Sequence, residues 1–164
     1  MDNLVEKLRG IPALEGVPAD QVSALAGLMT PRRLRSGEVL AAEWSSGNTL
    51  FVLLAGEVRL SRRTLDGDPY TVAELNGRDT PCFGEFALLA EARHGASIEA
   101  LLECELIALG RVAFERFGEQ YPQAGLRITR NLARRAVGEL GKVQDDAALL
   151  FEALVNEVRA KTAK

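Results

Sequence analysis

Of the residue types that commonly build active sites, histidine is the scarcest in this chain. Its 164 residues contain one, His94. Zinc and iron sites in small β-barrel proteins usually need several imidazoles, so the count argues against a histidine-rich metal centre. A Ser/His/Asp or Cys/His catalytic constellation cannot be built from a single histidine either. We therefore expect no catalytic residue and no metal ligand, and an enzyme is the weakest interpretation of the sequence.

Cysteines and long apolar runs are also scarce. Cys82 and Cys104 have no metal-ligand spacing and suggest no disulfide framework, so we expect reduced, structural thiols. The longest apolar run, residues 50–55, is far shorter than the roughly 20 residues of a membrane span. The N-terminal segment carries acidic residues where a secretory signal would be apolar. The expected location is cytoplasmic, with no membrane contact.

A large excess of charge is absent as well. The formal net charge is −3, with 47% hydrophobic and 26% charged residues. This is the composition of an ordinary globular protein, too apolar for a disordered chain. The weak negative charge predicts no general attraction to nucleic acid. The length suits one domain of about 100–150 residues with an attached element.

The middle of the chain has the pattern of a small β-barrel. Apolar and polar residues alternate over 57–61, and Asp66-Gly67 is the strongest hairpin signal. Other short strands are predicted over 38–41, 49–54, 70–75, 96–101 and 104–109, and residues 45–48 are predicted to turn. The predicted fold class is mainly β with flanking helices: a double-stranded β-helix (jelly roll) barrel with N-terminal helices and a long C-terminal helical segment.

Helices are predicted on both sides of the barrel. Residues 3–8 and a segment that starts at Pro18 have helical spacing before it, and the chain is helical again from Val112. A heptad rhythm then runs through Ala136, Leu140, Val143, Ala147, Leu150 and Leu154. This helix either lies on its own barrel or pairs with a second copy. We therefore divide the chain into a barrel domain, residues 1–125, and a C-terminal helical segment, residues 126–164.

Residues 82–97 contain the stretch that suggests chemistry. Residues 83–91 do not alternate and are typical of a short helix inserted into the barrel. Gly84 before that helix lets a ligand approach the backbone, and the N–H groups at a helix start favour an anion. Glu85 can accept a hydrogen bond from a hydroxyl such as a ribose 2′-OH. A cation a few residues further along would complete a phosphate pocket.

On these residues the sequence resembles the cyclic nucleotide-binding domain of catabolite activator proteins, cAMP-dependent kinase regulatory subunits and gated channels. The similarity covers roughly residues 3–140. It rests on Gly37-Glu38-Val39, on LFVLLAGEV at 50–58, on the Asp66-Gly67 hairpin, on FGEFALL at 83–89 in the place of the phosphate-binding cassette, and on residues 111–122 in the place of the following helix.

The resemblance implies a role for each matching position. Gly84 and the amides after it would contact the cyclic phosphate, and Glu85 would hold the ribose 2′-OH. The family has a phosphate-binding arginine where this chain has His94, and neutral histidine offers one donor where arginine offers a charged fork. Arg93 could take over that role only if a bulge at Gly95 shifted the register by one residue. The predicted ligand-binding residues are Phe83, Gly84, Glu85, Phe86, Ala87, Leu88, Arg93, His94, Ala96 and Ser97, the candidate ligands are cAMP and cGMP, and no cofactor is implied.

Two functions remain open at this point. In the first, the chain is a stand-alone sensory and regulatory module that binds a cyclic nucleotide or another small anion and signals through its C-terminal helices. In the second, it is a degenerate domain that binds no nucleotide and acts as a protein-interaction or dimerisation scaffold. In both cases a homodimer through the C-terminal helix is the expected assembly. A DNA-binding regulator would need a further winged helix domain beyond that helix, where residues 144–164 remain, so direct DNA binding is not expected.

Overall fold

The structure is a computed structural model that describes residues 2–162. Its strands are β1 Thr30–Leu34, β2 Val39–Ala41, β3 Ser46–Gly47, β4 Thr49–Ala55, β5 Glu57–Arg63, β6 Pro69–Asn76, β7 Cys82–Phe83, β8 Ala92–Arg93, β9 Ser97–Ala100 and β10 Cys104–Gly110. Its helices are α1 Asp2–Arg9, α2 Ala19–Ala26, α3 Arg111–Gln120 and α4 Pro122–Thr162, and three short 3-10 helices are η1 Pro12–Leu14, η2 Gly77–Asp79 and η3 Glu85–Leu88.

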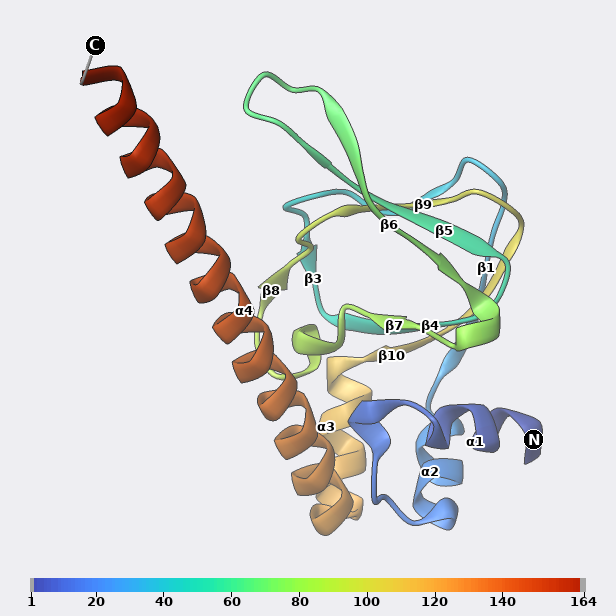
Figure 1. The fold of residues 1–164 in the computed structure, drawn as a ribbon. Coiled ribbons are helices and arrows are strands. Elements are labelled where there is room, and N and C mark those ends of the chain that lie inside the picture. Colours follow the sequence, from blue (N-terminus) through green and yellow to red (C-terminus); the bar gives the residue numbers. More distant parts are fainter. Residues whose placement is uncertain (1, 163–164) are drawn as a thin grey trace. The chain divides into compact units, whose positions relative to one another are not determined.

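Two antiparallel sheets form the barrel. One has the strand order β1-β10-β4-β7, the other has the order β2-β9-β5-β6, and β3 pairs with β8 in a small third sheet. Figure 1 shows the two large sheets facing each other, with the β5–β6 hairpin extending beyond them. The hairpin turns at Asp66-Gly67, where Gly67 has a φ of +91°. The predicted jelly roll with flanking helices is confirmed.

The barrel encloses an apolar core. Its buried members come from both sheets: Leu34, Leu53, Val58, Phe83, Ile98, Ala100, Cys104 and Leu106. Because neighbouring residues of a strand point to opposite faces, Leu50 and Val52 of β4 and Ile107 of β10 lie on the other side of their sheet. They are buried too, so this sheet is apolar on both faces. Helices α1, α2 and α3 lie beside β4 and β10 on that side (Figure 1).

Four strands were not predicted from the sequence: β1, β3, β7 and β8. β7 includes Phe83, which was predicted to begin the inserted helix. β1 is almost wholly exposed, with only Leu34 buried, so it has no alternation to detect. It lies at the edge of its sheet, where Pro31 is tolerated. Ser46 and Gly47, predicted to turn, instead pair as β3 with Arg93 and Ala92 of β8. A pairing of two residues on each side leaves no periodic pattern in the sequence.

The chain divides into two compact units at the boundary between Asn131 and Leu132, inside α4. In the first unit the side-chain amide of Asn131 donates to the carbonyl oxygens of Ala13 at 3.1 Å and Glu15 at 2.9 Å, which fixes the start of α4 to the N-terminal segment. The second unit is the remainder of α4. Among residues 2–162, no helix has the length and apolar character to cross a membrane.

Candidate functional site

The predicted cassette follows β7 and begins at Gly84. This residue has a φ of +74°, a left-handed conformation that glycine adopts without strain. A β-carbon at position 84 would lie 2.5 Å from the carbonyl oxygen of Thr49, so η3 begins in close contact with the backbone of β4. Both the backbone angle and the space therefore require glycine here.

The side chains of the cassette are mostly buried. Phe83 packs its ring against Phe51, with the ring centroids 6.1 Å apart, and belongs to the barrel core. Ala87 and Leu88 are buried as well, and Phe86 is half-buried. At these positions a ligand would meet backbone rather than side-chain atoms. Glu85 is 6% exposed and is the one charged residue among those described that is buried.

His94 faces this cassette from the end of β8. Its backbone N–H donates to the carbonyl oxygen of Ser45 at 2.9 Å, and its own carbonyl accepts from the N–H of Trp44 at 2.8 Å. A β-carbon on Gly84 would lie 3.8 Å from Cε1 of the imidazole, and one on Gly47 would lie 2.6 Å from Nε2. The imidazole therefore fits between two glycines, one on β3 and one at the start of the cassette.

Arg93 occupies the opposite face of this segment. Its partner across the small sheet is Ser46, and both residues are exposed. Consecutive residues of an extended segment alternate in direction, so a side chain at 93 points away from the face that His94 uses. The two side chains predicted as alternatives therefore point to opposite faces of the segment, and His94 is the one that lies against Gly84.

Burial determines the charge of His94. The imidazole is half-buried and desolvation lowers its pKa from the usual value of about 6.5. At neutral pH the side chain is therefore uncharged, with one N–H donor and one acceptor nitrogen. The site offers a weaker anion partner than an arginine would.

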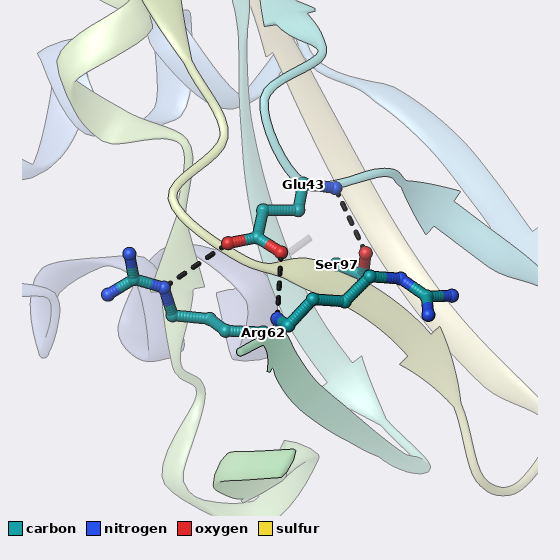
Figure 2. A network of polar contacts seen from close by, with 4 residues as sticks. Glu43, Arg62 and Ser97 are labelled. Atoms are coloured by element: carbon teal, nitrogen blue, oxygen red, sulfur yellow. Dashed lines mark hydrogen bonds and ion pairs between the residues drawn. The ribbon is translucent and has the colours of Figure 1, made fainter. Parts of the chain in front are cut away.

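Ser97, another predicted ligand-binding residue, takes part in a structural network (Figure 2). Its hydroxyl accepts from the backbone N–H of Glu43 at 2.9 Å. The Glu43 carboxylate accepts from Nε of Arg62 at 3.3 Å and from the N–H of Arg63 at 3.0 Å. This network ties the loop before β3 to β5 and β9. Ala96, between His94 and Ser97, is half-buried.

Sequence reasoning missed Gly47 and Trp44. Gly47 was predicted as a turn residue, yet its missing side chain makes the space for His94. Trp44 has a φ of +64° and is 59% exposed, although its N–H is bonded to His94. The glycine and serine residues at 45–48 are typical of a turn, but they do not reveal which side chain from a distant segment lies opposite Gly47.

A cavity of about 590 Å³ lies at the start of β4, lined by Thr30, Arg32, Arg33, Thr49, Phe51, Ala108 and Gly110 among others. Arg33 is paired with Glu105 at 3.0 Å, and Arg32 lies 3.9 Å from Glu38. Within residues 2–162, no group of three or more His, Cys, Asp or Glu side chains is arranged to hold a metal ion.

The chain is similar to three proteins that place these features in context. Glutaminase 1 of Bradyrhizobium diazoefficiens is 36% identical over 123 residues, which are 75% of this chain and 19% of that protein. The cyclic AMP receptor protein of Thermus thermophilus is 29% identical over 128 residues, or 78% of this chain and 58% of that protein. The crystal structure of the N-terminal domain of a Streptomyces coelicolor transcriptional regulator has a TM-score of 0.74 and 27% identity, and the match covers 80% of this chain and 91% of that domain.

These relatives include regulatory proteins and an enzyme, and this chain spans between about a fifth and three fifths of the two full-length proteins. The matches to these three proteins cover between 75% and 80% of this chain. Residues 31–121, which run from β1 to the end of α3, match the cyclic nucleotide-binding domain family. The fold, the cassette glycine and this match lead to one conclusion: the chain belongs to the cyclic nucleotide-binding domain family.

Proposed function

We propose that this chain is a sensory and regulatory module that binds a cyclic nucleotide with its phosphate against the neighbouring Gly84 and His94. One observation carries the proposal: the imidazole of His94, the residue in the place of the family's arginine, lies in contact distance of the cassette glycine. A glycine that exposes its backbone and a nitrogen donor on the adjacent segment are groups that a compact anion can contact together.

Other parts of the barrel suit the remainder of such a ligand. Glu85 begins η3 directly after Gly84, so its carboxylate is the candidate acceptor for a ribose hydroxyl. Half-buried apolar side chains pack on the barrel core and are available to a base: Leu40, Ala41, Phe51, Leu60 and Leu75. Pockets for small ligands commonly combine such apolar walls with a few polar groups that fix orientation.

The proposed signal leaves the barrel through α4. A ligand shifts an equilibrium between two helix arrangements only as far as it binds one of them more tightly. We propose that the cyclic nucleotide does so here, because the cassette and the first part of α4 belong to the same compact unit.

Isothermal titration calorimetry with cAMP and cGMP at about pH 7.5 tests the proposal. We expect saturable heat for one of the two nucleotides, and about tenfold tighter binding by His94→Arg, since a charged bidentate donor gains roughly 1–1.5 kcal/mol over a neutral single one. Arg93→Ala is the matched control, because this neighbour lies on the other face and should leave the affinity within about twofold. Nucleotide binding would be refuted if wild type and His94→Arg both showed no heat and no thermal shift at millimolar nucleotide.

A second candidate function, a dimerisation scaffold, is favoured by the surface of the second unit. Large apolar residues on one face of α4 are between 53% and 72% exposed: Val137, Leu140, Val143, Leu150, Phe151, Leu154 and Val158. At 3.6 residues per turn they form one continuous stripe, which is the arrangement of a helix that pairs with another. We propose a second copy of α4 as the partner of this stripe.

Analytical ultracentrifugation tests dimerisation through this stripe. We expect a dimer with or without cAMP, and dissociation to monomers in Leu150→Asp, which places a charge in the stripe. Leu149→Asp is the matched control, because Leu149 is equally long, is 65% exposed and lies on the other side of the helix. A monomeric wild type, or equal effects of the two substitutions, would contradict dimerisation through this face.

A further inference from the structure

The His94 imidazole has few neighbouring groups that could share a proton with it. The imidazole packs between Gly47 of β3 and Gly84, both of which lack a side chain. It is also the chain's single histidine, so no neighbouring imidazole shares its titration. A negatively charged group that binds at Gly84 would therefore lie close to this ring.

Few other charges surround the ring. Of the elements packed around it, β8 contributes Arg93, which is exposed on the opposite face, and η3 contributes the buried Glu85. β3 contributes no titratable group, and Thr49 of β4 contributes a backbone carbonyl beside Gly84. Glu43, in the loop before β3, has its carboxylate occupied by Arg62 and the N–H of Arg63.

The free protein keeps this imidazole neutral because burial lowers its pKa. A neutral ring has a lone pair on one nitrogen, which repels an anion, and a donor N–H on the other. An anion placed against the ring favours the charged form and raises the pKa again. The ligand and the proton therefore stabilise each other's binding.

We propose that an anionic ligand binds at Gly84 together with a proton, which His94 takes up from solvent. The proton adds to the free ring nitrogen, no covalent bond of the ligand breaks, and the protonated ring then presents two N–H donors. This inference rests on the proposed cyclic nucleotide function and makes that function dependent on pH. Affinity should rise as pH falls, by up to about tenfold per pH unit, between the pKa of His94 in the complex and its lower pKa in the free protein.

Calorimetry of the whole chain with cAMP at about pH 6.5, in PIPES and in bis-Tris, measures the proton directly, because the two buffers differ in ionisation enthalpy. We expect an observed enthalpy that changes with the buffer and corresponds to uptake of up to one proton. His94→Arg should bind cAMP with no uptake and with an affinity that is independent of pH, because arginine stays charged.

The single imidazole signal in an NMR titration provides the second measurement. Saturating cAMP should raise the pKa of His94, and this shift should account for the uptake found by calorimetry. Binding by the wild type with no proton uptake and no shift of the pKa would overturn the inference while leaving nucleotide binding intact. Absence of cAMP binding in both wild type and His94→Arg would instead overturn the proposed function, and this inference with it.

Discussion

Gly47 leaves the space that the imidazole of His94 occupies: a β-carbon at position 47 would lie 2.6 Å from Nε2. The two residues come from β3 and from the end of β8, which pair as a two-stranded sheet. On the other side of the ring a β-carbon at position 84 would meet Cε1 at 3.8 Å, an ordinary contact, so the absent side chain that makes room for the ring is that of Gly47. The orientation of the ring is therefore a property of Gly47 as much as of the histidine.

Gly47→Ala should displace the imidazole. The added methyl group would lie too close to Nε2 of His94, so the ring has to move. Because Gly84 lies on the other side of the ring, we expect the ring to move toward solvent. We expect the pKa of His94 to rise toward about 6.5 as the ring becomes more exposed. An NMR titration of the single histidine measures this. Gly95→Ala is the control, because a β-carbon there meets nothing within 4 Å, and identical titration curves for the two variants would contradict the prediction.

Gly84→Ala should destabilise the fold more than Gly37→Ala. Both glycines have a positive φ, +74° and +80°, so both substitutions carry a backbone strain of about 1–2 kcal/mol. Only at position 84 does the new methyl group also meet a backbone atom, the Thr49 carbonyl at 2.5 Å, whereas position 37 is open. Urea unfolding should therefore show an additional loss of about 1–3 kcal/mol for Gly84→Ala. Equal losses would mean that β4 moves to make room.

Local signals in the sequence predicted the parts of this fold that are determined locally. Asp66-Gly67 specifies its own turn, and the glycine of the cassette sits where a left-handed residue is needed. The heptad spacing of apolar residues in α4 can likewise be detected without knowing what the helix packs against. These features depend on backbone preferences and spacing within one segment.

Features that join distant segments could not be predicted in the same way. The pairing of Ser46 with Arg93 involves two short segments whose polar composition suits a turn equally well. The choice between Arg93 and His94 depended on which face of β8 meets Gly84, and register alone decides that. Both residues were candidates from the sequence, and in the structure His94 is the one whose side chain lies near Gly84.

Glu43→Ala should destabilise the chain by about 1–2 kcal/mol, because it removes the acceptor that the N–H of Arg63 and the guanidinium of Arg62 share. The Glu43 side chain is 10% exposed and that of Arg62 is 43% exposed, so solvent screens this pair from the arginine side only. Glu74→Ala is the control. Its carboxylate pairs with Arg59 at 3.1 Å, but with a side chain 46% exposed it should cost less than about 1 kcal/mol.

Urea unfolding of the two variants gives the comparison. A double-mutant cycle of Glu43→Ala with Arg62→Ala should show positive coupling, since the two side chains share one contact. Equal stability losses in Glu43→Ala and Glu74→Ala, or no coupling, would show that the network of Figure 2 contributes no more than a surface ion pair.

The lowered pKa of His94 predicts how stability depends on pH. Burial holds the folded-state pKa below the unfolded value of about 6.5, so the unfolded chain binds the proton more readily between these two values. This contribution of His94 to the free energy of unfolding is fully present above the unfolded pKa and is lost as pH falls through 6.5 toward the folded pKa.

His94→Gln removes this titration and keeps a neutral polar side chain. In urea unfolding followed from about pH 8 to pH 5, the free energy of unfolding of the wild type should fall more steeply than that of His94→Gln, with the divergence beginning near pH 6.5. The acidic residues are common to both proteins and cancel in the difference. Parallel curves would show that His94 titrates alike in the folded and unfolded chains, and that the two glycines do not keep its ring from water.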